Sequence, residues 1–326
     1  MTVDLTKKAP GGEQSFLWDK KILVTGAHGF MGQYLIKNLL EKRKVPKENL
    51  FLPTFEELDL RKWEDCKKAV RGQNIVIHLA AKVGGIGFNL EKPGELFFDN
   101  LVMGANLMEA ARQEGVEKFV AVITVCAYPK FTPVPFKEDD LWNGYPEETN
   151  APYGLAKKML LVQAQAYRKQ YGFNAISLLP VNMYGPGDNF DPSKSHVIAA
   201  LIKKFHDAKK NGIDHVEIWG TGKVSREFLY AEDGVEGILL AAEKYDKEDP
   251  MNIGVGKEIT IKDLVDVIVK LTDFKGEIRW DASKPDGQPR RMLDVSRAKQ
   301  ELGFEPKTDF VEGLKNTIEW YEQNSL

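Results

Sequence analysis

A short apolar segment near the start of the chain leads directly into three regularly spaced glycines. Residues 21–25 read Lys-Ile-Leu-Val-Thr, and Gly26, Gly29 and Gly32 follow at G-x-x-G-x-x-G spacing before an amphipathic segment at 34–40. A buried strand, a glycine turn and a helix in this order form the unit that holds a dinucleotide pyrophosphate at a helix N-terminus. Because this unit belongs to a parallel α/β sheet, it constrains the fold more than any other part of the chain.

The following residues repeat the alternation of strand and helix. We expect buried strands at 49–52, 74–79, 119–124 and 174–179, and helices at 101–114 and 153–171. Near-continuous apolar strands separated by helices are typical of a parallel sheet that is covered on both faces. The fold class that we predict is therefore α/β, a doubly wound parallel sheet of the Rossmann type.

The pattern changes after residue 190. We expect helices at 195–210, 232–244, 260–271 and 309–323, with strands at 216–219 and 277–280. This predicts a Rossmann domain at 1–190 plus about 227–256. A smaller, mixed α/β substrate domain is expected at about 191–226 and 257–326. The smaller domain would cover the carboxyl ends of the strands, where open α/β sheets bind ligands.

Composition excludes several classes of function. The formal net charge of −3 over 326 residues gives no basic surface for a nucleic acid. No segment approaches the ~18 apolar residues of a membrane span. The first twenty residues are polar, so we expect a disordered leader or a lid over the first strand. Two cysteines, Cys66 and Cys126, imply no disulfide framework and favour a cytoplasmic setting. We expect no metal.

A second chemical signal is the pair Tyr153 and Lys157. Positions i and i+4 share one face of a helix, so the phenol and the ammonium project into the same site. An ammonium beside a phenol favours the phenolate and is expected to lower the tyrosine pKa. Together with the glycine turn, this pair indicates an oxidoreductase in which the tyrosine manages a proton on an alcohol or sugar oxygen.

Several longer segments resemble one family of extended short-chain dehydrogenases/reductases. From about residue 20 to 323 the chain resembles the GDP-L-fucose synthases. The matching segments are 80–86 (AAKVGGI), 126–130 (CAYPK), 149–157 (TNAPYGLAK), 182–190 (NMYGPGDNF), 195–198 (SHVI), 219–222 (WGTG), 226–228 (REF) and 283–290 (SKPDGQPR). The resemblance implies epimerisation of GDP-4-keto-6-deoxy-D-mannose at C3 and C5, followed by reduction of the C4 ketone.

The resemblance also implies catalytic roles. Cys126 and His196 would form the acid/base pair of the epimerisation, with the cysteine as base. Tyr153 would donate a proton to the C4 oxygen, while Lys157 tunes Tyr153 and holds the nicotinamide ribose. Thr124 stands where the family has a serine and would hydrogen-bond the ketone.

Binding residues follow from the same match. The nicotinamide dinucleotide, NADP or NAD, is expected to contact Gly26, His28, Gly29, Phe30, Met31, Gly32, Asp59, Leu60, Leu79, Ala80, Ala81, Tyr153, Lys157, Pro180, Asn182, Met183 and His196. The GDP-sugar, or another NDP-sugar, is expected to contact Val83, Asn182, Lys204, Trp219, Arg226 and Asp286. Lys204 replaces an arginine, so it keeps the charge and loses the two-pronged hydrogen bond.

The sequence does not decide between NAD and NADP, because the arginines with which the family binds the 2′-phosphate of NADP are absent. Those places hold His28 and the segment 52–55 (LPTF), and no acidic residue ends the second strand as an NAD site prefers. In addition, Val125 replaces a serine near the nicotinamide. These departures leave an NAD-dependent NDP-sugar epimerase with retained cofactor as the alternative function. A nucleotide-sensing protein without activity is a third hypothesis, which the intact Tyr153 and Lys157 disfavour.

The superfamily also implies a homodimer. Two helices from each subunit would form a four-helix interface, and the surfaces expected here are helices 97–114 and 153–171.

Overall fold

The computed structural model describes residues 15–325 apart from residues 193 and 285. Most of the expected leader lies outside the described residues. From Ser15 onward the chain packs against the main core, because Leu17 is fully buried there. Among the described residues, no helix combines the length and the apolar character that crossing a bilayer requires.

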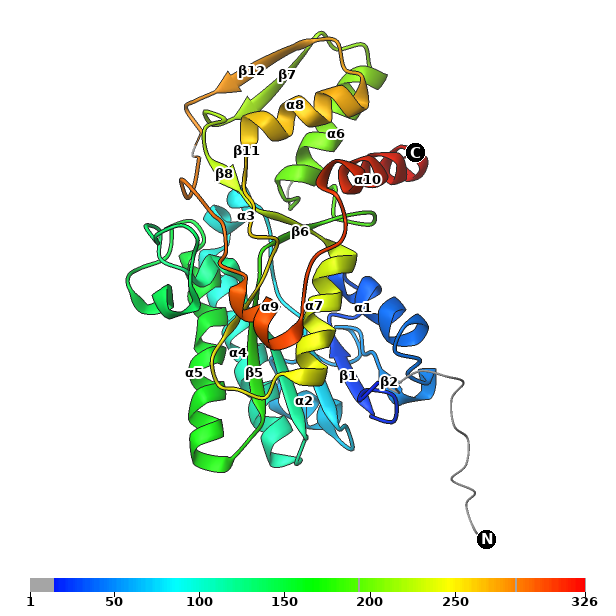
Figure 1. The fold of residues 1–326 in the computed structure, drawn as a ribbon, viewed down its shortest axis with the longest axis vertical. Coiled ribbons are helices and arrows are strands. Elements are labelled where there is room, and N and C mark those ends of the chain that lie inside the picture. The colour runs from blue at the N-terminus through cyan, green and yellow to red at the C-terminus, as the bar shows by residue number, and fades with distance from the viewer. Residues whose placement is uncertain (1–14, 193, 285, 326) are drawn as a thin grey trace.

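A six-stranded parallel sheet forms the larger part of the molecule (Figure 1). Its strand order is β10-β5-β4-β3-β1-β2, which confirms the doubly wound class. The strands are β1 (Ile22–Thr25), β2 (Leu50–Phe51), β3 (Ile75–His78), β4 (Lys118–Val122), β5 (Ala175–Pro180) and β10 (Met251–Ile253). All but β2 are buried along their whole length, as expected for strands that are covered on both faces.

Helices cover both faces of this sheet, and each face has its own hydrophobic cluster. One face carries α1 (Phe30–Glu41), α7 (Ala231–Lys244) and α9 (Ser296–Leu302). The other carries α2 (Trp63–Val70), α4 (Pro93–Gln113) and α5 (Ala151–Tyr171). The helix expected at 101–114 is thus longer at its N-terminal end, where Pro93 begins it, and the short α2 was not predicted.

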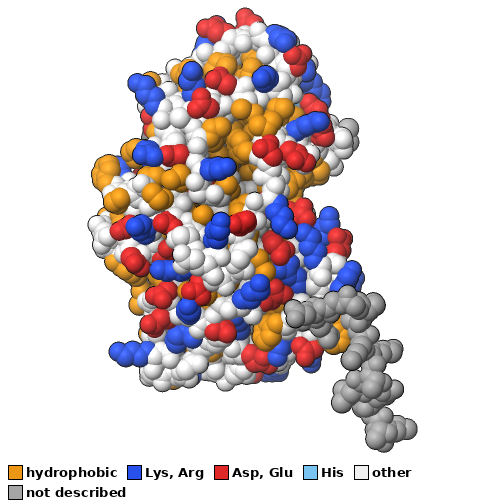
Figure 2. All heavy atoms as spheres, in the orientation of Figure 1, with side chains coloured by type: hydrophobic (Ala, Val, Ile, Leu, Met, Phe, Trp, Pro, Cys, Tyr) orange, Lys and Arg blue, Asp and Glu red, His pale blue; other side chains and the backbone are white. Residues whose placement is uncertain are grey.

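A smaller part with a third hydrophobic cluster lies beyond the carboxyl ends of the strands (Figure 1). Its helices are α6 (Val197–Lys210), α8 (Ile261–Thr272) and α10 (Phe310–Asn324). Two-stranded pairings link β7 (His215–Trp219) with β12 (Glu277–Asp281), β8 (Ser225–Arg226) with β11 (Ile259–Thr260), and β6 (Asn182–Tyr184) with β9 (Phe228–Tyr230). Figure 2 shows hydrophobic side chains gathered near α8 and α10 and charges of both signs over the rest of this face.

Side-chain caps fix where two of these helices begin. The Thr260 hydroxyl accepts a hydrogen bond from the Asp263 amide at 3.0 Å at the start of α8. The Asp309 carboxylate accepts from the amides of Val311 and Glu312 at the start of α10. Such caps satisfy amides that have no partner within the helix.

The chain leaves β1 toward β2 on one side and returns to β3 on the other. β1 pairs with β3 from Ile22 with Ile75 to Thr25 with His78, and with β2 at Ile22 and Leu23. Strand order reverses at this point, which is where open α/β sheets bind ligands. The crevice therefore opens at the carboxyl ends of β1 and β3, below the smaller part.

Candidate functional site

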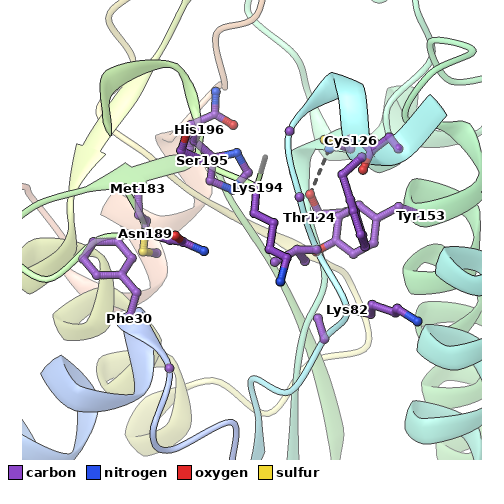
Figure 3. A pocket seen from close by; sticks show the side chains of 18 of the residues that line it. Phe30, Lys82, Thr124, Cys126, Tyr153, Met183, Asn189, Lys194, Ser195 and His196 are labelled. Carbon is purple, nitrogen blue, oxygen red and sulfur yellow. Dashed lines mark hydrogen bonds between the residues drawn. The ribbon is translucent and has the colours of Figure 1, made fainter. Parts of the chain in front are cut away.

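One large cleft occupies this crevice, with a volume of about 1480 Å³. Its floor is formed by the ends of β1, β3, β4 and β5, and its roof by α6, β7 and β8. In Figure 3, Thr124, Cys126 and Tyr153 lie on one wall, and Phe30, Met183 and Asn189 lie on the opposite wall. This volume exceeds the roughly 300–1,000 Å³ of pockets that hold one drug-sized molecule, so the cleft has room for more than one ligand.

The glycine turn forms one end of the cleft. Gly26 has a φ of +72°, and a Cβ at this position would lie 2.8 Å from the Ala80 amide nitrogen. Gly29 caps the twelve-residue helix α1 with extended backbone, so the free amides of the first turn face the cleft. A Cβ on Gly32 would collide with the backbone of Gly26 and Ala27. These constraints fit the pyrophosphate of a nicotinamide dinucleotide.

The opposite wall is built on a short 3-10 turn after β4. The Thr124 hydroxyl accepts a hydrogen bond from the Cys126 amide at 3.2 Å, drawn as a dashed line in Figure 3. A side chain on Gly154 would collide with the Cys126 carbonyl, so glycine lets α5 approach this turn closely. This contact brings Tyr153 beside Thr124 and Cys126.

Tyr153 and Lys157 are both desolvated. Desolvation, and then the nearby Cys126, raise the pKa of Tyr153 above its ordinary value. Burial lowers the pKa of Lys157 to about 8, and this ammonium forms no ion pair among the described residues. The expected lowering of the tyrosine pKa is therefore wrong, because desolvation of the phenolate is the largest influence on this pKa and raises it.

One arginine, Arg291, lies against the thiol of Cys126. Arg291 is 5% exposed, and its Nη1 lies 3.7 Å from the Cys126 Sγ. The Nε of Arg291 donates to the Gln288 side chain at 3.0 Å, and the Gln288 amide in turn donates to the Pro129 carbonyl. Gln288 thus holds the guanidinium beside the thiol.

The same guanidinium acts on two further groups. His196 faces the open cleft at the start of α6, and desolvation together with the charge of Arg291 lowers its pKa. Burial, and then the neighbouring Arg291, lower the pKa of Arg226 to about 9. Arg226 and Arg291 therefore bring positive charge to the cleft, and in the part of the chain that the structure describes neither forms an ion pair with a carboxylate.

Polar and aromatic groups from the smaller part line the far end. Arg226 donates to the backbone carbonyls of Ser225, Gln288 and Asp286 at 2.6–3.0 Å. The Asp286 carboxylate accepts from the amide and hydroxyl of Thr221, both at 2.8 Å. The exposed Trp219 indole lies 6.0 Å from the Lys204 ammonium. An indole face beside cations suits a planar base with a pyrophosphate next to it.

Comparison with known proteins decides the family. The model of the NAD dependent epimerase/dehydratase family matches residues 22–254. The chain belongs to this family. It is 39% identical to GDP-L-fucose synthase 1 of Arabidopsis thaliana over 318 residues, which cover 96% of this chain and 97% of the relative. The resemblance found in the sequence is thereby confirmed.

Solved structures agree with this assignment. A GDP-6-OMe-4-keto-L-xylo-heptose reductase from C. jejuni superimposes with a TM-score of 0.88 at 29% identity, covering 95% of this chain and 99% of that one. A GDP-L-fucose synthetase from Naegleria fowleri bound to NADP gives 0.83 at 27% identity, covering 96% and 98%. The protein is thus an NAD(P)-dependent enzyme of the extended short-chain dehydrogenase/reductase type.

The structure brings nearly all the predicted residues of this epimerase-family enzyme to the cleft. The cleft is lined by Gly26, His28, Gly29, Phe30, Met31, Gly32, Leu60, Leu79, Ala80, Ala81, Val83, Thr124, Cys126, Tyr153, Lys157, Pro180, Asn182, Met183, His196, Lys204, Trp219, Arg226 and Asp286. Asp59 does not line it. Its carboxylate binds Arg61 instead, and Arg61 lines the cleft.

Several residues that line the cleft, among them Arg291, Lys194 and Arg61, were not predicted from the sequence. Arg291 directly follows the matched segment 283–290, so the match itself ended one residue short of it. Lys194 points into the middle of the cleft (Figure 3). Arg61 carries no motif and joins the cleft only through the fold. Phe55, which also lines the cleft, belongs to the segment 52–55 that the sequence match places where the family has an arginine. Among the described residues, no three His, Cys, Asp or Glu side chains gather in a way that could hold a metal ion.

Proposed function

We propose that the enzyme converts GDP-4-keto-6-deoxy-D-mannose to GDP-L-fucose, by epimerisation at C3 and C5 and reduction at C4. The observation that carries this proposal is the meeting of Cys126, His196 and Tyr153 at one cleft that ends in a glycine turn. Two acid/base groups and a proton-donating phenol suit a reaction that inverts carbons beside a ketone and then reduces the ketone.

The epimerisation needs proton removal from one face of the sugar and delivery to the other. In this proposal the Cys126 thiolate takes the proton from the carbon beside the ketone, and the electron pair moves to the C4 oxygen. His196 then returns a proton on the opposite face. Arg291, whose Nη1 lies 3.7 Å from the Cys126 sulfur, would place its positive charge near the negative charge that develops on the C4 oxygen.

Reduction uses the same oxygen. The nicotinamide, when bound, supplies the hydride to C4. Tyr153 donates its proton to the C4 oxygen, and Thr124 hydrogen-bonds that oxygen from the adjoining turn. Because desolvation keeps the Tyr153 phenol protonated, the group begins the step in the form that can donate. Lys157 would hold the nicotinamide ribose.

The GDP portion would occupy the far end of the cleft. Arg226 and Lys204 would neutralise the pyrophosphate, and Trp219 would cover the base. Asp286, Val83 and Asn182 would complete the sugar-nucleotide contacts. The names of the relatives support this choice of substrate.

A second candidate is an NAD-dependent NDP-sugar epimerase that retains its cofactor. The observation that favours it is the absence of a lysine or arginine in segment 52–55, beside the glycine turn. A retained NAD would store the hydride and return it, so no nucleotide would be consumed.

Three further assignments accompany the proposal. We assign residues 1–190 with about 227–256 to cofactor binding, and about 191–226 with 257–326 to the sugar nucleotide. A homodimer through α4 and α5 is supported by the exposed Phe97, Phe98 and Val162 on these helices. A cytoplasmic location is supported by the two free thiols.

The test separates the two chemical steps. Purified enzyme is incubated with GDP-4-keto-6-deoxymannose in D₂O, with and without NADPH or NADH. We expect deuterium at C3 and C5 without reductant, and GDP-fucose with stoichiometric oxidation of one reductant. Cys126→Ser and His196→Asn should lose the exchange, and Tyr153→Phe should keep it while losing reduction. Absence of net oxidation, with bound NAD released on denaturation, would replace this proposal by the epimerase.

A further inference from the structure

The structure defines the end of the cleft where the adenosine ribose of a dinucleotide lies. The His28 Nε2 is 3.0 Å from the Leu52 carbonyl oxygen, which ties the glycine turn to the segment that follows β2. In Rossmann folds this place reads the ribose, with a carboxylate for a 2′-hydroxyl or an arginine for a 2′-phosphate. The surroundings of this contact therefore decide which dinucleotide fits.

The segment after β2 offers no positive charge. Pro53, Thr54, Phe55 and Glu56 line the cleft, and the Phe55 ring is 59% exposed. The Thr54 amide, which a phosphate would need, donates instead to the Glu57 carboxylate at 2.8 Å. The Thr54 hydroxyl accepts from the Glu57 amide at 3.3 Å. The Thr54 amide is thus committed to a carboxylate, and Glu56 also lines this part of the cleft.

Two cations that line the cleft, Arg61 and Lys82, are held in ion pairs. Arg61 lies 5.3 Å from the Phe55 ring, and its guanidinium binds Asp59 at 2.9 Å and Asp99 at 3.4 Å. Lys82 binds Asp99 at 2.9 Å and Glu95 at 2.5 Å. Two cations therefore face three carboxylates, and a 2′-phosphate dianion would have to compete with those carboxylates for them.

From this geometry we propose that the enzyme selects NAD(H) over NADP(H), with Phe55 and His28 as the residues that set the preference. The proposal rests on the proposed function in one respect, namely that a nicotinamide dinucleotide binds the glycine turn. A neutral ribose hydroxyl needs no cation, whereas a 2′-phosphate meets an aromatic ring and a net negative cluster. This chain thereby differs from the Naegleria relative that was solved with NADP.

The experiment measures nucleotide binding, independently of turnover. The full-length protein, stripped of nucleotide, is titrated with NAD⁺ and with NADP⁺, and quenching of its tryptophan fluorescence gives both dissociation constants. We expect NAD⁺ to bind at least about tenfold more tightly, because one missing charge-assisted hydrogen bond changes affinity by roughly that factor. Phe55→Arg with His28→Arg should remove or reverse that preference.

A matched control separates local from general electrostatics. Phe51→Arg adds the same charge on the exposed side of β2, at a residue that does not line the cleft. It should leave the ratio of the two constants unchanged. All these side chains are exposed, so unchanged melting curves will show that the variants fold.

Each contrary result has its own meaning. Equal or tighter binding of NADP⁺ by the unmodified protein would overturn the selectivity and leave the proposed reaction standing. A Phe51→Arg effect as large as that of Phe55→Arg would overturn the role of the ribose end. Failure of both nucleotides to bind would remove the proposed function together with this inference.

Discussion

The cationic side chains at the two ends of the cleft differ in whether carboxylates pair with them. The sugar end is the part near Cys126 and the smaller part of the molecule, and the adenosine end is the part near the segment that follows β2. At the sugar end, Arg226, Arg291 and Lys157 are buried and carry no ion pair among the described residues. At the adenosine end, Arg61 and Lys82 are tied to three carboxylates. Buried, unpaired cations are costly to fold and therefore mark places where an anionic ligand or intermediate supplies the missing partner.

The cations at the sugar end lack carboxylate partners among the described residues and, if the proposed ligands bind as expected, can pair with the phosphates of the sugar nucleotide, whereas the cations at the adenosine end are already paired with carboxylates. At the sugar end, the desolvation cost of the buried cations is not offset by a carboxylate, and a bound pyrophosphate or an oxyanion would offset it. At the adenosine end the cations already have carboxylate partners, so we expect a 2′-phosphate to add little binding free energy there.

The largest expected effect separates catalysis from cofactor binding at the sugar end. Tyr153→Phe removes the phenolic proton, and we expect reduction to fall by about 10³-fold, within the range known for general acids. NAD⁺ affinity should change less than about twofold, because the ring remains. Net nucleotide oxidation and fluorescence titration measure the two effects. Tyr145→Phe, an exposed position outside the cleft, is the control.

A substitution of Lys157 tests whether its buried, unpaired ammonium destabilises the folded protein. Burial lowers its pKa to about 8 from 10.5, so the folded state holds this proton less tightly than the unfolded state. The destabilisation is fully present below pH 8 and disappears as the pH rises to 10.5. We expect Lys157→Met to raise the free energy of unfolding at pH 7 by about 3 kcal/mol.

Urea unfolding at neutral and at alkaline pH measures this effect. The gain from Lys157→Met should shrink at alkaline pH, and activity should be lost throughout. Lys169→Met, on the exposed last turn of α5, should change neither stability nor activity appreciably. A destabilised Lys157→Met protein at pH 7 would contradict a destabilising effect of the buried ammonium.

Arg291 and Arg290 are neighbours in the sequence and differ in whether they contact Cys126. Arg291 lies against the Cys126 sulfur, whereas Arg290 is exposed and pairs with Glu258. We expect Arg291→Gln to slow deuterium exchange at C3 and C5 by about 30-fold, because one charge-assisted contact is lost. Arg290→Gln should stay within about twofold of the unmodified enzyme. Equal effects of the two changes would remove the role given to Arg291.

The smallest expected effect lies at the adenosine end. Asp99 accepts from both Arg61 and Lys82, so Asp99→Asn frees part of their charge. We expect NADP⁺ affinity to rise about threefold, a modest change because the two cations keep Asp59 and Glu95, and NAD⁺ affinity to stay constant. Glu109→Gln, on the same helix and paired with Arg112, is the control. A gain for both nucleotides would show a general charge effect.

The sequence predicted the fold and most of the cleft for identifiable reasons. The glycine turn, the apolar strands and Tyr153 with Lys157 are local patterns, and the structure places them where those patterns require. The contacts of the charged side chains in the cleft could not be predicted from the sequence. Two contacts between distant segments could not be predicted from spacing: the ion pair of Arg61 with Asp99 and the contact of Arg291 with Cys126.

The pKa of Tyr153 shows a second limit. Helical spacing correctly places Lys157 beside it, but the outcome depends on desolvation, which only the packed structure reveals. Asp59 is a second example: the sequence match predicted that it contacts the cofactor, whereas in the structure its carboxylate binds Arg61.

The contrast between the two ends is tested most directly with small ligands that each occupy one end. Isothermal titration would compare GDP with GMP at the sugar end, and adenosine 2′,5′-bisphosphate with 5′-AMP at the adenosine end. The account predicts that the second phosphate strengthens binding at least about tenfold for GDP and not at all for the adenosine bisphosphate. Tighter binding of the adenosine bisphosphate than of 5′-AMP, by a similar factor, would contradict it.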